Sequence, residues 1–167
     1  MGEIAGKIAE NGKPDESVWD FPRPPRLESV AWRIRVVHGG MTVVDAPEVF
    51  RVLETSQPPA YYVAPEHVDL DRLRASDHRT FCEGKGVASY ADVVAGDTVA
   101  ARAAWTYLEP TTRFAEIVDH WAFYAQLLDE CWVDDERVAP NDGSFYGGWI
   151  TANVTGPFKG APGTAHW

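Results

Sequence analysis

The chain is poor in cysteine, and little in it marks a thiol or metal site. Only Cys82 and Cys131 occur in 167 residues. Because no CxxC pair is present, a zinc site of four thiolates is excluded. The N-terminal residues lack the apolar stretch of a signal peptide, and nothing else supports a disulfide. We therefore expect a cytoplasmic protein with reduced thiols.

Basic residues are also scarce. Fifteen lysines and arginines stand against 25 acidic residues, which leaves a formal net charge of −10. A protein that binds a phosphate backbone normally carries a basic patch, and no run of basic residues occurs here. The same shortage disfavours an anionic membrane surface, and no stretch approaches the ~20 apolar residues of a membrane span. We expect neither a nucleic-acid partner nor a membrane partner.

The motifs of common enzyme classes are missing too. The glycines around Lys85 lack the GxxxxGK[ST] spacing of a phosphate loop, and neither GxSxG nor a Rossmann glycine pattern is present. The five histidines are scattered, without HxH or HExxH spacing. The sequence gives no reason to expect a metal or a cofactor.

Aromatic residues are abundant instead, numbering 20 of 167. The length suits one domain. We expect a flexible polar leader over residues 1–17 and a single domain over residues 18–167. The proline-rich stretch 18–26 favours an extended path, pinned to the body by Trp19 and Phe21. The tail 139–167 is rich in glycine, yet its aromatic residues predict that it docks irregularly on the core.

Period-two patterns predict two β-hairpins, over residues 32–45 and 86–107. Their turns fall at Gly39-Gly40 and at Ala95-Gly96-Asp97. Alternation in the last arm places its apolar residues on one face: Val99, Ala101, Ala103, Trp105 and Tyr107.

Two segments, 46–55 and 120–133, fit a helix or a strand equally well. Apolar residues from Phe114 to Leu128 recur with helical spacing. We therefore expect at least one helix, with Thr112 as its N-cap.

Three residues are candidates for acid–base chemistry. Glu54 ends an apolar run, where a carboxylate is unexpected, and a buried Glu54 would suit a general base or a ligand anchor. An ion pair to Arg35 or simple exposure explains Glu54 equally well. Lys85 lies between two glycines that would present its ammonium, and Lys85 or Tyr90 would act as the acid or the oxyanion stabiliser. A solvated lysine in a turn is the plain alternative, and Cys82 is more simply a small core residue than a nucleophile.

Some of the aromatic residues are candidates for a pocket wall. Trp105 and Tyr107 share a strand face, and with Tyr62 and Trp149 they would surround a flat or cationic ligand. Most of the 20 aromatic residues are expected to be core.

Several short motifs follow one another along the chain: Arg35-Val36-Val37-His38-Gly39-Gly40, Val52-Leu53-Glu54-Thr55, Pro59-Ala60-Tyr61-Tyr62, Cys82-Glu83-Gly84-Lys85-Gly86-Val87-Ala88-Ser89-Tyr90, Ala104-Trp105-Thr106-Tyr107-Leu108-Glu109-Pro110 and Ala122-Phe123-Tyr124. In this order they resemble the family of domain of unknown function 427, over about residues 30–138. The resemblance implies a mainly β fold, similar to the β-tent group, with one or two short helices. The zinc staple of other β-tent proteins is not implied, because its paired CxxC is absent.

The sequence therefore predicts a domain that binds a small molecule in an aromatic pocket with Glu54 and Lys85 as polar anchors. A metal-independent acid–base enzyme using Glu54, Lys85 and Tyr90 is the first alternative. An interaction module that forms a homodimer through an aromatic face or an edge strand is the second.

Overall fold

The computed structural model describes residues 7–143 and 146–167 and shows a mainly β protein, as expected. The strands are β1 (Glu16–Ser17), β2 (Arg26–Val30), β3 (Ile34–His38), β4 (Met41–Ala46), β5 (Val49–Leu53), β6 (Ala60–Tyr62), β7 (Leu73–Cys82), β8 (Gly86–Ala95), β9 (Thr98–Tyr107), β10 (Trp121–Phe123), β11 (Glu130–Val133), β12 (Glu136–Arg137), β13 (Ala139–Pro140), β14 (Trp149–Ile150) and β15 (Val154–Thr155). Short 3-10 helices connect them: η1 (Val18–Asp20), η2 (Pro65–His67), η3 (Leu70–Arg72), η4 (Thr112–Ile117) and η5 (Ala125–Leu127).

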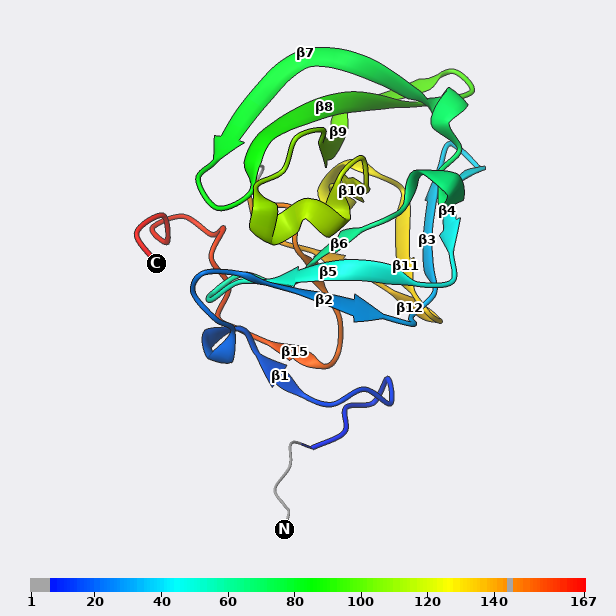
Figure 1. Ribbon diagram of the computed structural model, residues 1–167. Helices are drawn as coiled ribbons and strands as arrows, with labels where there is room; N and C mark the ends of the chain where they lie inside the picture. Colours follow the sequence, from blue (N-terminus) through cyan, green and yellow to red (C-terminus); the bar gives the residue numbers. More distant parts are fainter. Residues whose placement is uncertain (1–6, 144–145) are drawn as a thin grey trace.

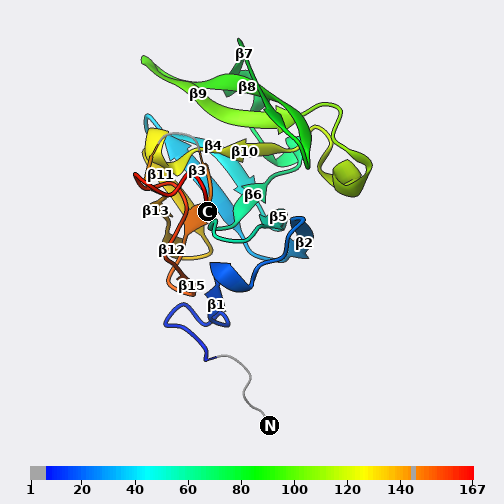
Figure 2. The same ribbon diagram turned by 90° about the vertical axis from the view of Figure 1, so that its left-hand side faces the viewer.

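Three sheets surround the core. One has the order β10-β9-β8-β7, the second β12-β11-β3-β4 and the third β2-β5-β6. All pairs within them are antiparallel. In Figures 1 and 2 the long strands β7 and β8 arch over one end of the molecule, and β5 and β2 lie on the opposite side of β10. A bridge between Val63 and Trp121 links the β6 and β10 strands, so the first and third sheets meet there.

Both predicted hairpins are present. β3 and β4 turn at Gly39-Gly40, where both glycines have positive φ, and β8 and β9 turn at Gly96-Asp97. Ile34 and Val36 are fully buried, as their alternation with the arginines of β3 predicts.

The single apolar face predicted for β9 is wrong in its first half. Arg102 has a φ of 55°, and the register of β8 and β9 shifts opposite it, between Ala91 and Val93. Such a bulge reverses which side chains point inward. Accordingly Val99 is 49% exposed, whereas Trp105 and Tyr107 are buried.

The two ambiguous segments are strands with short helical turns. Residues 49–53 form β5, and residues 120–133 contain β10, η5 and β11. The helix expected from the spacing of residues 114–128 is present as the short η4, but its N-cap is Thr111 and not Thr112. The chain leaves the helical conformation at Asp119, with a φ of 61°, and β10 then pairs with β9. The helical spacing did not mark one buried face: Phe114 and Ile117 are fully buried, whereas Val118 and Leu127 are 43% and 45% exposed.

The N-terminal segment packs against the tail. The leader expected over residues 1–17 includes residues 1–6, which lie outside the described residues. From Asn11 the chain contacts the body: the Asn11 amide donates to the Glu136 carboxylate at 2.8 Å, the Lys13 ammonium lies 2.7 Å from the Asp134 carboxylate, and β1 pairs in parallel with β15. The Trp19 ring meets that of Trp167 at 5.3 Å, edge to face.

A buried arginine anchors this segment to β5. Arg51 is 3% exposed and donates two hydrogen bonds to Glu16, at 2.7 and 2.8 Å, and one to Glu28 at 2.7 Å. Its guanidinium also lies 4.7 Å from the ring centroid of Trp32. Burial opposes the guanidinium charge, but the hydrogen bond to Glu16 and the nearby negative charges raise the pKa of Arg51. One charged residue therefore joins the strands β1, β2 and β5.

Candidate functional site

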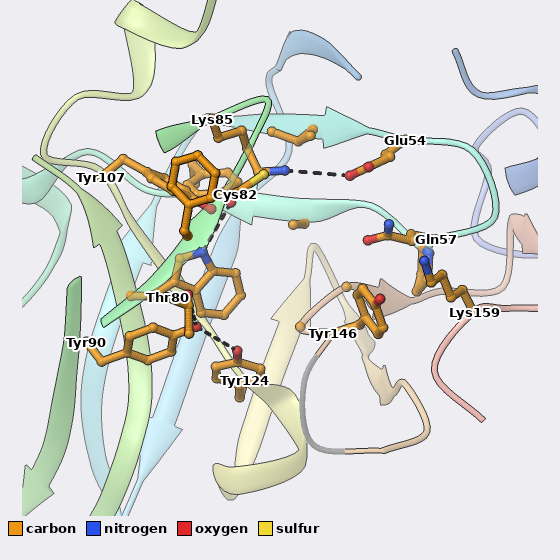
Figure 3. Close-up of a pocket in the computed structure, with 18 residues that line it drawn as sticks. Glu54, Gln57, Thr80, Cys82, Lys85, Tyr90, Tyr107, Tyr124, Tyr146 and Lys159 are labelled. Atoms are coloured by element: carbon orange, nitrogen blue, oxygen red, sulfur yellow. Dashed lines mark hydrogen bonds and ion pairs between the residues drawn. The ribbon is translucent and has the colours of Figure 1, made fainter. Parts of the chain in front are cut away.

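A pocket of about 250 Å³ lies between the β7-β8-β9 sheet and the end of β5 and start of β6. Three residues of the tail form a further wall: Gly147, Gly148 and Tyr146, the last of which is labelled in Figure 3. Six of the seven predicted site residues line it: Glu54, Tyr62, Lys85, Tyr90, Trp105 and Tyr107. Residues distant in the sequence thus converge on one cavity.

Glu54 and Lys85 meet on one side of this pocket. Glu54 directly follows β5, and Lys85 lies in the turn between β7 and β8. The Lys85 Nζ is 3.6 Å from a carboxylate oxygen of Glu54, as Figure 3 shows. The ion pair of Glu54 is therefore made with Lys85 and not with Arg35.

The turn that carries Lys85 is held by the segment before η4. The Thr111 N–H donates to the carbonyl of Lys85 at 2.9 Å, and its hydroxyl donates to the carbonyl of Gly84 at 2.7 Å. Gly86, with a φ of +115°, passes so close to Glu109 that an added Cβ would lie 3.1 Å from that residue's carbonyl oxygen. The Gly84-Lys85-Gly86 sequence therefore turns the lysine inward, and Lys85 is only 8% exposed.

Lys85 keeps its positive charge in this buried position. Burial is the largest influence and favours the neutral amine, but Tyr62, Glu54 and Cys82 together oppose it and raise the pKa of Lys85. The side chain is thus an ammonium at neutral pH, suited to hold an anion or stabilise an oxyanion. A neutral amine for nucleophilic chemistry is disfavoured.

Two hydrogen-bonded groups of side chains form the aromatic lining. The Trp105 Nε1–H donates to the Tyr62 hydroxyl at 3.2 Å. The Tyr90 hydroxyl lies 3.0 Å from that of Thr80 and 3.3 Å from that of Tyr124. Tyr90 and Tyr62 therefore belong to two separate hydrogen-bonded sets of side chains.

Three of the pocket tyrosines, Tyr62, Tyr107 and Tyr124, are neutral hydroxyls at physiological pH. Burial is the main cause that raises the pKa of each. They can donate and accept hydrogen bonds, but none is poised to act as a phenolate.

Trp149, the seventh predicted residue, does not line the pocket. It is 1% exposed in the main core, its ring lies 5.3 Å from that of Tyr61, and its Nε1–H donates to the carbonyl of Phe123 at 2.8 Å. The two preceding glycines form the wall in its place. A Cβ on Gly147 would collide with the Trp105 ring, and one on Gly148 with the carbonyl oxygen of Pro58.

The sequence did not predict six polar or aromatic lining residues: Gln57, Thr80, Phe81, Tyr124, Tyr146 and Lys159. Tyr124 lies in the Ala122-Phe123-Tyr124 motif and Lys159 in the glycine-rich tail, so both segments were noted but neither residue was assigned to the pocket. Cys82, considered as a core thiol, also lines the pocket and is half-buried.

In the described parts of the chain, no group of three or more His, Cys, Asp and Glu is arranged to hold a metal ion. Over the same residues, no helix has the length and apolar character needed to cross a membrane.

The fold and the pocket define a small β-rich domain with an aromatic, charge-bearing cavity. The chain belongs to the family described as domain of unknown function (DUF427), whose match covers residues 26–134. No curated protein matches the chain. The family description assigns no activity, so the chemistry of the pocket is the basis for function.

Proposed function

We propose that the chain is a small-molecule binding domain whose ligand occupies the pocket between β5, β6 and the β7-β8-β9 sheet. The observation that carries this proposal is the combination of an aromatic lining with a buried ammonium in one cavity of about 250 Å³. Binding pockets are typically apolar cavities in which a few placed polar groups set orientation. Since a water occupies about 30 Å³ in the liquid, the volume corresponds to about eight waters and suits a small metabolite.

A buried lysine also needs a reason. An ammonium removed from water costs free energy unless it is well paired. The Glu54 partner is at 3.6 Å, beyond a direct hydrogen bond, and its side chain is 30% exposed. The ammonium also donates a hydrogen bond to the Cys82 thiol, and the Phe114 ring centroid lies 5.9 Å away, but neither carries the full charge that would pair with it. A ligand anion would supply a stronger partner to one of its three N–H donors.

The experiment is a screen of a small-metabolite library by melting temperature and tryptophan fluorescence. Hits should be lost or weakened in Trp105→Ala and Lys85→Met. The matched control is Trp132→Ala, because Trp132 is partly exposed on β11 and does not line the pocket. A folded Trp105→Ala protein that bound every hit unchanged would rule out this pocket. If Trp105→Ala does not fold, Lys85→Met and Trp105→Phe provide the same comparison.

An acid–base enzyme is the second candidate, and the meeting of Glu54 with Lys85 at 3.6 Å favours it. Glu54 would take a proton from the ligand while the Lys85 ammonium stabilised the oxyanion that develops. Tyr90 would serve at a different part of the pocket. With a bound metabolite in hand, Glu54→Gln should abolish its turnover and retain its binding. Unchanged turnover in that variant would eliminate this mechanism.

A further inference from the structure

The pocket carries a charge opposite to that of the chain. The whole sequence has a formal charge of −10. Among the described residues, the charged groups that line the pocket are Lys85, Lys159 and Glu54. The lining thus has one more positive charge than negative. An acidic protein that places two of its few lysines at one cavity offers an anion an attractive position there.

The two lysines differ in how they are held. Lys85 is buried in the β7–β8 turn, whereas Lys159 is half-buried in the tail. The Lys159 Nζ lies 5.2 Å from the ring centroid of Tyr146 and donates to the carbonyl of Trp167 at 3.2 Å. In Figure 3 Lys159 lies beside Gln57 and Tyr146, away from Lys85. Lys85 is therefore the inner cation and Lys159 the outer one.

An anion can reach Lys85 without breaking a tight ion pair. The contact with Glu54 is 3.6 Å, longer than the 2.7–2.9 Å of a charge-assisted hydrogen bond. The ammonium has three N–H donors, and the neighbouring Tyr62 and Tyr107 hydroxyls stay protonated. A ligand oxygen near Lys85 is thus surrounded by more hydrogen-bond donors, from the ammonium and the two hydroxyls, than carboxylate acceptors.

The remaining lining favours a flat group. The rings of Trp105 and Tyr124 lie 4.6 Å apart at 49°, and both are buried. Gly147 brings the tail backbone against the Trp105 ring, where any side chain would collide. These buried rings give the cavity an aromatic wall, and the quadrupole of an aromatic ring favours packing against another flat ring.

We propose that this pocket takes a small aromatic carboxylate, with the carboxylate at Lys85 and the ring against Trp105. This inference rests on the proposed binding function and adds the class of ligand. A cationic ligand would also find aromatic faces, but Lys85 and Lys159 would repel it.

The test uses three probes of similar shape: benzoate, its neutral amide benzamide, and benzyltrimethylammonium. Calorimetry gives their affinities, and the Trp105 indole N–H signal, assigned with Trp105→Phe, reports where they bind. We expect benzoate to bind roughly ten- to hundredfold tighter than benzamide, as one charged hydrogen-bond pair provides. Lys85→Met should abolish this preference and Lys85→Arg should retain it. Lys7→Met is the charge-matched control, because Lys7 is exposed and does not line the pocket.

The outcomes separate the two proposals. If benzamide or benzyltrimethylammonium binds as tightly as benzoate, or if Lys85→Met keeps the preference, the anionic ligand class is wrong and the pocket stands. If the metabolite library yields pocket hits but none of the three probes binds, the aromatic carboxylate is also wrong and binding stands. If neither the library nor the probes bind, both proposals fail.

Discussion

The anchoring of the N-terminal segment by Arg51 leads to a quantitative prediction about stability. Arg51→Met would keep an apolar side chain at this position but remove the guanidinium from Glu16 and Glu28. The two carboxylates then retain longer contacts of 3.4 Å, with Asn153 and Arg26 respectively. Removing one member of a buried ion pair costs about 3–5 kcal/mol, because the other charge remains poorly solvated. Glu16 and Glu28 are 22% and 32% exposed, so water can partly replace the guanidinium. We expect a loss at the low end, about 3 kcal/mol.

The assay is urea unfolding followed by tryptophan fluorescence, with thermal melting as a second measure. For a domain of this size a loss of about 3 kcal/mol corresponds to a fall in Tm of about 6–12 °C. The matched control is Arg33→Met. Arg33 also makes two hydrogen bonds to one carboxylate, that of Asp45, at 2.9 and 2.8 Å, but both side chains are about half exposed. Its removal should leave the Tm nearly unchanged.

Both arginines make a bidentate pair with one carboxylate, but Arg51 is buried and also bonds to Glu28, whereas Arg33 is exposed and pairs with Asp45 alone. Equal effects of Arg51→Met and Arg33→Met would show that the buried network of Arg51 adds nothing to stability. Should Arg51→Met fail to fold, Glu16→Gln tests the same contact, because it removes one charge and leaves Glu28 to pair with Arg51.

Three further predictions concern other sites. Iodoacetamide should alkylate Cys82 in the native protein and Cys131 only after unfolding, because burial raises the pKa of Cys131 to about 12. Mass spectrometry gives the order of labelling, and early labelling of Cys131 would contradict this prediction. Gly147→Ala should lower stability by about 1–3 kcal/mol and shift the indole N–H signal of Trp105, since the new methyl group collides with that ring; an unmoved signal would show that the tail does not pack there. Burial is the largest single influence on the pKa of Asp134 and would raise it, but hydrogen bonds from Lys13 and Arg33 together outweigh burial and lower the pKa below 3.8. The ionised Asp134 therefore stabilises the fold above pH 3.8, and this stabilisation is lost as the pH falls through the lowered pKa. Asp134→Asn should therefore lower the Tm at pH 7 but match the native chain in strong acid, and a constant difference across pH would contradict this.

The hairpins were predictable from the sequence because each is local. Their turns contain glycine, and their arms alternate in period two, so the pattern and the partner lie within about 20 residues of one another. The bulge at Arg102 was not predictable, since an arginine with positive φ leaves no mark in the sequence. The helix expected after Thr112 is present only as the short η4. The apolar residues of the pattern belong to several elements, and Val118 and Leu127 are exposed, so the spacing did not mark one buried helix face.

The site was predictable in its residues more than in its geometry. Glu54 was notable as a carboxylate at the end of an apolar run, and Lys85 as a cation between glycines. That they meet depends on the packing of the β7–β8 turn against the end of β5, a long-range contact that no spacing encodes. Trp149 shows the opposite limit. Its neighbours Gly147 and Gly148 line the pocket, but the indole lies in the core, where its Nε1–H donates to the carbonyl of Phe123 and its ring packs near that of Tyr61.

The pocket has two origins along the chain. The family match ends at residue 134 and contains the inner side, with Glu54, Lys85 and the rings of Trp105 and Tyr124. The outer wall, Tyr146 to Gly148 and Lys159, lies beyond that match. A relative that kept the matched segment and carried another tail would retain the buried ammonium and the ring surface but present a different entrance. If the pocket binds the proposed ligand class, a change of tail alone would then alter which members of that class can enter, while Lys85 and the rings of Trp105 and Tyr124 would stay the same.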